Sequence, residues 1–406
     1  MKLARVTLRK RLARAIRGGH PWIYRDALVA PPPLPDGTTV LVVDANDRPL
    51  GCGFWDADSP IAVRVLGEVR QADLPAEIER RIGAALTRRL ESIDRHETDA
   101  FRWIHGEADH LPGIHVDVYG AALSLRYDGA GARAFYRELP ERLRDVAGRA
   151  DLAVESVVER RPRQANDGGE KATGSTDTGF GAVTVFGAKP EGEIEIREHG
   201  LRFGVDLLRG QKGGLFLDQR ENRALVRTLA EGRRVLNLFG YTGGFSIYAA
   251  AGGARETVTV DVAAPAIAAA RRNFARNRLP SDRAHFAAED AFAFLARAAA
   301  VGEQFDLVVS DPPSFAPNRR ALSTGLAAYR RLHRLCAGVT APGGILCAAS
   351  CSSHVGRDAF VATVREGVAD AGRRAELREL RGAAIDHPVI PQFPEGDYLK
   401  FAVVAL

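Results

Sequence analysis

The 406-residue sequence has few cysteines and no long apolar run. Its four cysteines lack a paired Cys-x-x-Cys spacing, which argues against a disulfide scaffold and a zinc site, so no metal is expected. No apolar run reaches the roughly 18 residues of a membrane span, and the first residues lack the apolar stretch of a secretory signal. We therefore expect a cytoplasmic protein without a membrane partner, built from roughly two to four domains.

Basic residues are distributed unevenly along the chain. The net charge is only +5, but residues 1–25 carry eight basic side chains and no acidic one before Asp26. Such a segment favours a polyanionic partner such as RNA. A solvated basic helix or an arginine-rich targeting peptide has the same composition and remains an alternative at this point.

The patterns of strands and helices divide the chain into three predicted domains. Short strands interrupted by Gly, Pro and Asp predict a small β-rich domain over residues 1–72. Helical spacing of apolar residues over 75–95, followed by strand-like runs, predicts a mixed α/β domain over 73–190. Within it, residues 164–181 are rich in Gly, Ser, Thr and Asp and predict a loop without assigned function. Over 191–406, strands alternate with alanine-rich helices, which predicts a doubly wound, Rossmann-like α/β domain.

The ends of four predicted strands in the third domain suit a nucleoside ligand. A glycine-containing turn follows the first strand, and Asp261, Asp290 and Asp311 follow the next three. Glycine lets the backbone approach a ligand, and Asp261, 21 residues after Gly240, is placed to accept hydrogen bonds from ribose hydroxyls. Each Asp could instead cap a helix, but the ordered set favours a nucleoside. The cofactor-binding residues expected from the turn are Asn237, Phe239, Gly240, Tyr241, Thr242 and Gly243.

This arrangement resembles the class I S-adenosylmethionine-dependent methyltransferases. The sequence Asp311-Pro312-Pro313-Ser314-Phe315 is similar to their fourth motif. The resemblance implies S-adenosylmethionine as cofactor, with Asp311 next to it. The proline-locked loop is expected to hold a flipped base through Pro312 and Pro313, with Phe315 as a stacking face.

A cysteine follows a later strand of the same domain. The apolar strand that begins at Ile345 ends in the thiol of Cys351, which is expected at the cofactor crevice. A thiolate that adds to carbon 6 of a pyrimidine makes carbon 5 a nucleophile, so Cys351 and Asp311 are the candidate catalytic residues. The other cysteines are expected to be buried apolar residues. Candidates for removing the carbon 5 proton are His354, Glu395 and Asp397.

Further motifs extend the resemblance over nearly the whole chain. They lie at residues 106–113, 211–220, 311–315, 387–391 and 394–400. Together they resemble the large-subunit rRNA cytosine-5 methyltransferases, which have an N-terminal PUA domain, a central mixed α/β domain and a C-terminal methyltransferase domain. The resemblance implies 23S rRNA as partner and Cys351 as nucleophile. It also implies Gln219 and Arg220 near the cofactor and Lys212 near the RNA or the cofactor, although Lys212-Gly213-Gly214 replaces the usual Lys-Thr-Gly.

The PUA resemblance gives the basic segment a function, and some alternatives stay open. Arg9, Arg11, Arg14 and His20 are expected to contact the RNA. Enzymes that methylate carbon 5 of uridine also combine an Asp-Pro-Pro loop with a Ser-Cys element, so cytosine and uridine both remain candidates. Methylation of a base nitrogen and a non-catalytic RNA-binding protein are further alternatives, and homodimerisation is left open.

Overall fold

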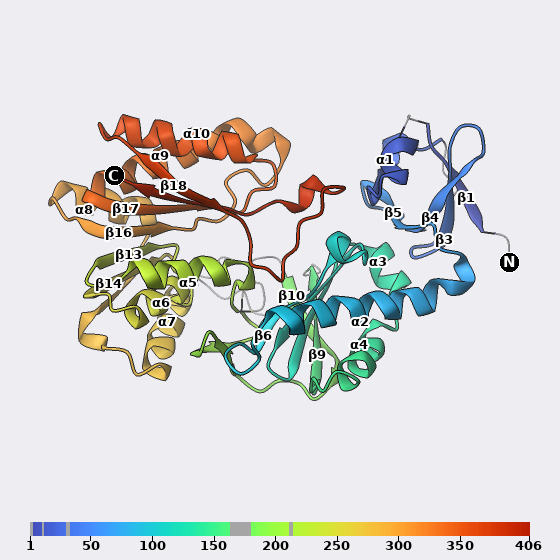
Figure 1. Cartoon of the computed structure of the whole chain (residues 1–406), viewed down its shortest axis with the longest axis horizontal. Coiled ribbons are helices and arrows are strands. Elements are labelled where there is room, and N and C mark those ends of the chain that lie inside the picture. Colours follow the sequence, from blue (N-terminus) through green and yellow to red (C-terminus); the bar gives the residue numbers. More distant parts are fainter. Residues whose placement is uncertain (1–2, 10–11, 30–32, 163–179, 211–213) are drawn as a thin grey trace.

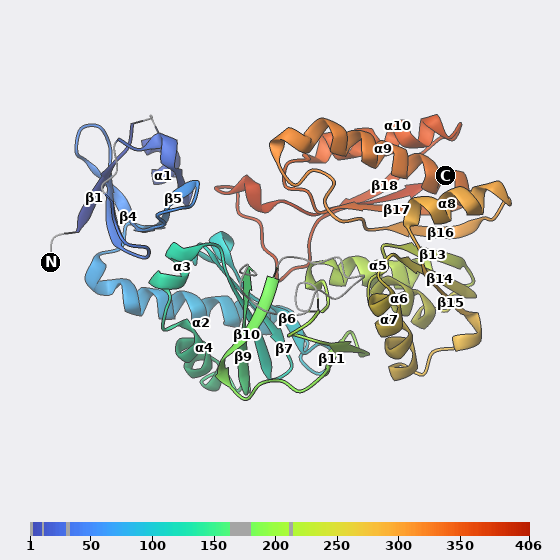
Figure 2. The same ribbon diagram turned by 180° about the vertical axis from the view of Figure 1, so that it is seen from behind.

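The computed structural model describes residues 3–9, 12–29, 33–162, 180–210 and 214–406. These residues form three β-sheets of five, five and seven strands and one separate two-stranded hairpin. Figure 1 and Figure 2 show the three sheets in three bodies that follow one another along the chain. Arg11, Lys212 and most of the predicted loop over 164–181 lie outside the described residues. No helix in the described ranges combines the length and apolar composition needed to cross a bilayer.

The first body is a five-stranded sheet in the order β1-β3-β4-β5-β2. Strand β1 runs parallel to β3 and the other neighbours are antiparallel. The elements are β1 (Ala4–Thr7), α1 (Ala13–Arg17), β2 (Trp22–Tyr24), β3 (Thr39–Val43), β4 (Pro49–Trp55) and β5 (Ile61–Gly67). The basic segment therefore does not form one solvated helix: it is divided between a sheet strand and a five-residue helix that buries Ile16.

The second body packs a long helix against a sheet in the order β10-β9-β8-β7-β6. The predicted helix over 75–95 is α2 (Leu74–Ser92), which buries Ile78, Ile82 and Leu86 against the sheet as the apolar spacing indicates. The other elements are β6 (Ala100–His105), β7 (Ile114–Tyr119), β8 (Ala122–Tyr127), α3 (Ala130–Phe135), α4 (Leu139–Gly148), β9 (Ser156–Pro162) and β10 (Phe180–Gly187).

The third body contains a seven-stranded sheet in the order β15-β14-β13-β16-β17-β19-β18, and it confirms the predicted doubly wound fold. The five strands from β15 to β17 are parallel, and β19 is antiparallel to both of its neighbours. Its strands are β13 (Arg234–Leu238), β14 (Glu256–Asp261), β15 (Ala284–Ala288), β16 (Phe305–Ser310), β17 (Thr340–Ser350), β18 (Glu376–Arg381) and β19 (Lys400–Ala405). The separate hairpin, β11 (Ile194–Glu198) and β12 (Leu201–Val205), packs next to it.

Helices cover both faces of the seven-stranded sheet. One layer consists of α5 (Arg220–Leu229), α6 (Gly244–Ala251) and α7 (Ala264–Arg276). The other consists of α8 (Ala291–Ala300), α9 (Leu322–Val339) and α10 (Arg357–Asp370). Figure 1 shows the two layers below and above the strands. Because both faces are covered, the central strands β13 and β16 bury most of their residues.

Residues 382–399, which we call the strap, leave the third body between β18 and β19 and contact the other two bodies (Figure 1, Figure 2). Asp386 of the strap accepts a hydrogen bond from the backbone N–H of Arg102 at 2.7 Å. The Phe393 ring packs edge to face on Trp22 of the first body, with centroids 4.5 Å apart. The strap therefore joins all three bodies at one junction.

Candidate active site

The register of the sheet brings the predicted strand ends to one edge. Leu238 at the end of β13 is paired with Val260 of β14 on one side and Ser310 of β16 on the other. Ser310 is paired in turn with Ala348 of β17. Because these strands are parallel, the segments that follow them leave the sheet at the same edge. The strand order reverses between β13 and β16, and a crevice forms at such a point.

The turn after β13 has a backbone suited to a close ligand. Phe239, Tyr241 and Gly243 all have positive φ angles, of 57°, 46° and 86°. A Cβ atom at Gly240 would lie only 2.6 Å from the methyl group of Thr259, so this position requires glycine. No described side chain caps the start of α6, which leaves its first backbone N–H groups for a ligand.

Asn237 and Thr242 are buried side chains of the predicted turn and support it from within. Asn237 is 1% exposed and donates from Nδ2 to Ser246 Oγ at 2.9 Å, while its Oδ1 has no partner within the described ranges. Thr242 is 6% exposed, and its carbonyl accepts from Asn273 Nδ2 at 3.1 Å. Asn237 Oδ1 is thus a buried acceptor that has no hydrogen-bond partner within the described ranges.

The acidic residues after β14 and β15 lie in different environments. Asp261 is half-buried and accepts from the N–H of Tyr241 at 2.9 Å and of Ala263 at 2.8 Å, so it braces the turn at the crevice. Asp290 is exposed and caps α8 by accepting from the N–H of Ala293 at 2.9 Å. Asp290 therefore has the helix-capping role that the sequence left as its alternative, and its contact with the cofactor stays a prediction.

Gln219 and Arg220 are buried at the start of α5, where their contacts differ. The guanidinium of Arg220 binds both oxygens of Asp386 at 2.9 and 3.0 Å, and both side chains are at most 2% exposed. Gln219 Oε1 accepts from Asn222, whereas its Nε2 has no partner in the described part of the chain. Arg220 therefore binds the strap, whereas Gln219 keeps a buried donor without a partner in the described chain, and the contact of both residues with the cofactor stays a prediction.

Cys351 lies directly after β17 in a turn held by serine hydroxyls. The Ser352 Oγ atom is 2.5 Å from Ser314 Oγ and accepts from the N–H of Ala316 at 3.3 Å. The Ser350 hydroxyl bonds the Tyr329 hydroxyl at 3.0 Å. These contacts fix the Cys351 turn against the loop that follows β16. Neither the serine contacts nor Tyr329 was found from the sequence, since the residues are far apart in the chain.

The same contacts bring Cys351 to the Asp311 loop. Its Sγ atom lies 4.0 Å from the carbonyl oxygen of Pro312. Of the four cysteines, Cys351 alone is half-buried, and Cys52, Cys336 and Cys347 are buried as expected. Burial raises the pKa of the thiols of Cys336 and Cys347 to about 12, which keeps both inert at neutral pH.

The loop residues predicted to hold a base differ in exposure. Asp311 is half-buried at the crevice edge, Pro312 is buried and Pro313 is exposed. The Phe315 ring packs against Tyr329 with centroids 4.8 Å apart, and it belongs to the margin of the core beneath the loop. Phe315 therefore supports the loop, and its role as a stacking face stays a prediction.

Comparisons with known proteins place the chain in a family. The model of the S-adenosylmethionine-dependent methyltransferases matches residues 178–374, and the model of PUA-like domains matches residues 6–68. The ribosomal RNA large subunit methyltransferase I of Tolumonas auensis is 35% identical over 98% of each chain. The corresponding methyltransferase of Deinococcus radiodurans is 37% identical over 97% of this chain and 96% of its own. The chain belongs to the ribosomal RNA large subunit methyltransferase I family.

Solved structures show the fold of this methyltransferase in other proteins. The crystal structure of SMU.776 complexed with SAH superposes with a TM-score of 0.83 at 21% identity over all of both chains. A SAM-dependent methyltransferase from Streptococcus mutans gives a TM-score of 0.82 at 19% identity, again over all of both chains. The expected PUA-like, central and methyltransferase parts are confirmed as fold classes.

The cofactor of this methyltransferase is S-adenosylmethionine, and the crevice fits it. Asn237 Oδ1 and Gln219 Nε2 are buried polar atoms without partners among the described residues, as expected of atoms that bind a ligand. Val262, next to Asp261, exposes 61% of its surface.

The three candidates for proton removal are not equivalent. His354 is exposed three residues after Cys351. Asp397 accepts from Nε and Nη2 of Arg357 at 2.7 and 2.9 Å. Glu395 lies 3.4 Å from His20 at the junction with the PUA-like part. Among the three candidates, His354 is therefore the one that forms no ion pair with another described side chain.

The basic residues of the first 25 positions differ in exposure, and some of them make contacts within the fold. Arg9 and Arg14 are exposed on the PUA-like part. His20 is half-buried and contacts both Phe393 and Glu395 of the strap, so it belongs to the domain junction. Arg25 donates to two backbone carbonyls and lies over the Trp55 ring, which makes it a structural residue.

One group of side chains has the composition of a metal site. Potential ligand atoms of Glu107, His115 and Asp128 lie within 4.8 Å of one another. However, Glu107 Oε1 already accepts from Trp22 and Arg64 at 2.7 and 3.0 Å, and His115 Nε2 is 2.8 Å from Asp128. The guanidinium supplies the positive charge that a metal would bring, so the group works as an ion-pair network.

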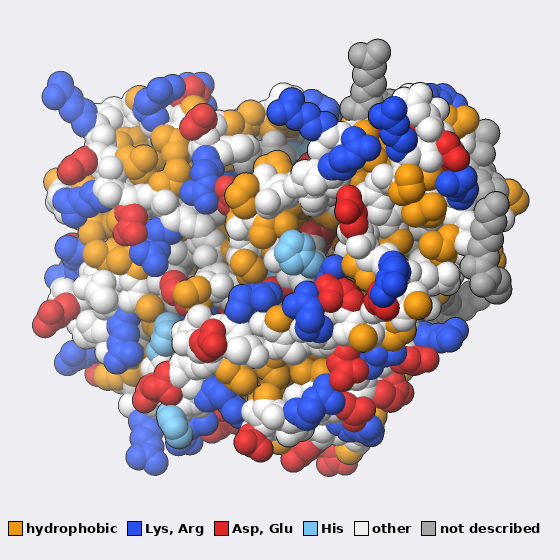
Figure 3. Space-filling model, turned by 45° about the vertical axis from the view of Figure 1, so that its right-hand side comes forward, with side chains coloured by type: hydrophobic (Ala, Val, Ile, Leu, Met, Phe, Trp, Pro, Cys, Tyr) orange, Lys and Arg blue, Asp and Glu red, His pale blue; other side chains and the backbone are white. Residues whose placement is uncertain are grey.

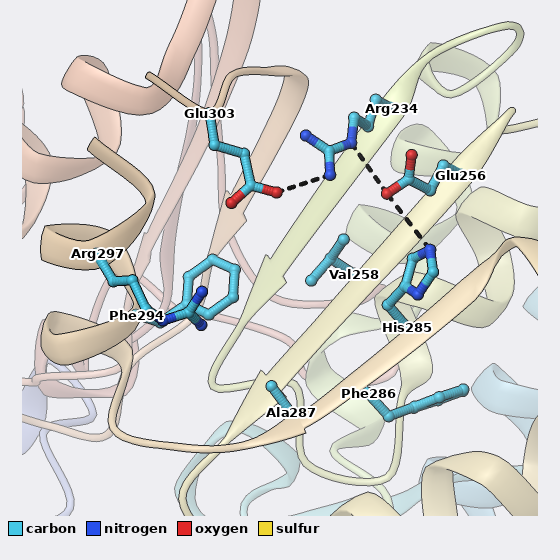
Figure 4. A pocket seen from close by; sticks show the side chains of 9 residues that line it. All are labelled: Arg234, Glu256, Val258, His285, Phe286, Ala287, Phe294, Arg297 and Glu303. Carbon is cyan, nitrogen blue, oxygen red and sulfur yellow. Dashed lines mark hydrogen bonds and ion pairs between the residues drawn. The ribbon is translucent and has the colours of Figure 1, made fainter. Parts of the chain in front are cut away.

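A pocket of about 280 Å³ lies at the opposite edge of the sheet (Figure 4). Arg234 and Glu256 begin β13 and β14, and Arg234 pairs with Glu256 at 2.9 Å and with Glu303, which precedes β16, at 2.7 Å. The cofactor crevice lies at the carboxyl ends of the same strands. This pocket is therefore separate from the active site, and the charges of Arg234 are neutralised within it.

Proposed function

We propose that this methyltransferase forms 5-methylcytidine in 23S rRNA through a covalent adduct of Cys351. The observation that carries the proposal is the position of the half-buried Cys351 thiol, 4.0 Å from the carbonyl of Pro312 at the cofactor edge. The proteins of Tolumonas auensis and Deinococcus radiodurans, which match this chain over nearly their whole length, are named ribosomal RNA large subunit methyltransferases. Their names support rRNA as the substrate class.

In the proposed reaction the thiolate of Cys351 forms a bond to carbon 6 of a flipped cytosine. The electron pair of the 5,6 double bond moves to carbon 5, which then accepts a methyl group. When bound, S-adenosylmethionine supplies that group as an electrophilic methyl on a sulfonium. A base removes the carbon 5 proton, the double bond forms again and the thiolate leaves. In this proposal the carbonyl of Pro312 accepts a hydrogen bond from the exocyclic amine of the base, a donor that cytosine has and uridine lacks.

Basic side chains near the crevice are proposed to bind the phosphates. Arg319 and Arg320 follow the Asp311 loop, are exposed and form no ion pair within the described residues. Arg9 and Arg14 provide further positive charge on the PUA-like part. Figure 3 shows Lys and Arg side chains around a hollow in one face of the molecule. Phosphate contacts of this kind position an RNA without reading its sequence.

Product analysis tests the proposal. A 23S rRNA transcript is incubated with S-adenosylmethionine and the wild type, Cys351→Ala or Cys347→Ala, and its nucleosides are identified by mass spectrometry. We expect 5-methylcytidine from the wild type and from Cys347→Ala, which changes a buried cysteine, and none from Cys351→Ala. A 5-methyluridine product would overturn the assigned base. A methylated base nitrogen, or normal methylation by Cys351→Ala, would overturn the covalent mechanism.

A further inference from the structure

Lys400, the first residue of β19, is buried next to the Cys351 turn. It is fully buried, and the register of β17 and β19 places it opposite Ser350. Its Nζ atom donates to the carbonyl oxygens of Ser352 at 2.6 Å and Tyr398 at 2.8 Å. Lys400 thus contacts the chain on both sides of Cys351.

The ammonium group of Lys400 lacks a negative partner. Within the described chain both of its hydrogen bonds end on neutral carbonyls, and it forms no ion pair with a carboxylate. The buried arginines, in contrast, are paired: Arg220 with Asp386, and Arg223 with Glu198. A buried charge without a counter-ion is costly, so its presence calls for an anion nearby.

The thiolate of Cys351 is the anion that fits this position. Burial raises the pKa of Tyr329 from α9 and of Tyr398, so both face Cys351 as neutral hydroxyls at neutral pH. Asp397 is already paired with Arg357 of α10, and its charge acts on Lys400 together with that of Cys351.

Lys400 remains charged under physiological conditions. Burial lowers the pKa of Lys400 to about 8, and the charges of Asp397 and Cys351 act in the opposite direction. At pH 7 the side chain is therefore mostly protonated. Two of the three N–H donors of the ammonium are used by carbonyls, and one remains.

We propose that Lys400 is a positioning residue that holds Cys351 as a thiolate ready to attack the base. The inference rests on the proposed function, in which Cys351 is the nucleophile. A nearby cation favours the thiolate, which is the reactive form of cysteine. The proton of the thiol passes to solvent in the free enzyme, and the ammonium stays protonated as the counter-ion.

The first test measures the reactivity of Cys351 without RNA or cofactor. The rate of its alkylation by iodoacetamide is followed against pH by peptide mass spectrometry in the wild type, Lys400→Met and Lys189→Met. Lys189 is exposed and outside the site, which makes it the matched control. In Lys400→Met the midpoint of the pH profile of Cys351 alkylation should rise by about one pH unit or more, and the alkylation rate at pH 7 should fall about tenfold. An unchanged midpoint in a folded Lys400→Met protein would overturn the proposal.

The second test does not depend on the folding of a Lys400 variant. The chain has only six lysines, so ¹³Cε-labelled lysine gives few NMR signals to assign. Coupling between two groups is reciprocal, so loss of the thiolate must also change the titration of the lysine. The signal of Lys400 should titrate at a lower pH in Cys351→Ala than in the wild type. Equal midpoints would overturn the coupling.

The two proposals fail in different ways. Normal methylation by Cys351→Ala would refute the covalent function whether or not Lys400 and Cys351 titrate together. Unchanged alkylation in Lys400→Met together with loss of activity in Cys351→Ala would refute the role of Lys400 alone.

Discussion

The Ser314 and Ser352 hydroxyls lie 2.5 Å apart and join the loop after β16 to the turn after β17. The loop after β16 contains Asp311, Pro312 and Pro313, and the turn after β17 contains Cys351. Ser352 is 1% exposed, so this contact is shielded from water. The position of the nucleophile relative to the base-binding loop therefore depends on a bond between residues 38 positions apart.

Ser352→Ala should slow catalysis more than it weakens cofactor binding. The variant loses the contacts with Ser314, Ala316 and Tyr329, which together contribute about 1 to 2 kcal/mol. We expect kcat to fall about tenfold with an unchanged Kd for S-adenosylmethionine. Ser353→Ala, which changes an exposed neighbour, is the control. Equal kcat values for the two variants would contradict a positioning role.

Asp261→Ala should weaken cofactor binding more than Asp290→Ala does. Asp261 braces Tyr241 at the crevice, whereas Asp290 is exposed and caps α8. Isothermal titration calorimetry should show that Asp261→Ala lowers the affinity for S-adenosylmethionine about tenfold or more, since a hydrogen bond to a charged group contributes about 1.5 to 3 kcal/mol. The loss for Asp290→Ala should be smaller, and a larger one would reverse our assignment.

Asp386→Ala should loosen the strap and destabilise the protein. Burial would raise the pKa of Asp386, but His387 and Arg220 lower it, so the carboxylate is charged. Its removal leaves the buried Arg220 with the half-buried Glu221 as its remaining ion-pair partner among the described residues, which costs about 3 kcal/mol. Calorimetry should show a clear fall in Tm for this variant. Asp370→Ala, which removes the exposed partner of Arg330, should change Tm little.

His333 should make the methyltransferase part sensitive to acid. Burial lowers the pKa of His333 to about 4, whereas in the unfolded chain it titrates near 6.5. The unfolded state therefore binds a proton that the folded state does not, and stability falls as the pH decreases from 6.5 to 4. By pH 5 the loss is about 2 kcal/mol. His333→Leu should lose less stability than the wild type between pH 7 and pH 5 in urea unfolding, and identical losses would contradict this origin.

The local patterns of the sequence were sufficient to predict the five parallel strands of the third body and the position of Cys351 at the end of one of them. Parallel strands end at a common edge, so the order of Gly240, Asp261, Asp311 and Cys351 along the chain predicts a common crevice, as the register shows. Family resemblance supplied the PUA-like part and the cofactor.

Contacts between distant residues were not predictable in this way. Arg220 was expected near the cofactor, but its partner Asp386 lies 166 positions away on the strap. Lys400 is adjacent to Cys351 only because β19 runs antiparallel to β17 at the edge of the parallel strands. Nothing in the local sequence encodes either pairing.

Covalent trapping tests the central claim most directly. RNA that contains 5-fluorocytidine cannot lose a proton from carbon 5, so the bond between enzyme and base persists after methyl transfer. With S-adenosylmethionine present, we predict a stable protein–RNA adduct whose crosslinked peptide contains Cys351, and no adduct with Cys351→Ala. An adduct that still forms with Cys351→Ala, or an active wild type that forms none, would contradict the account.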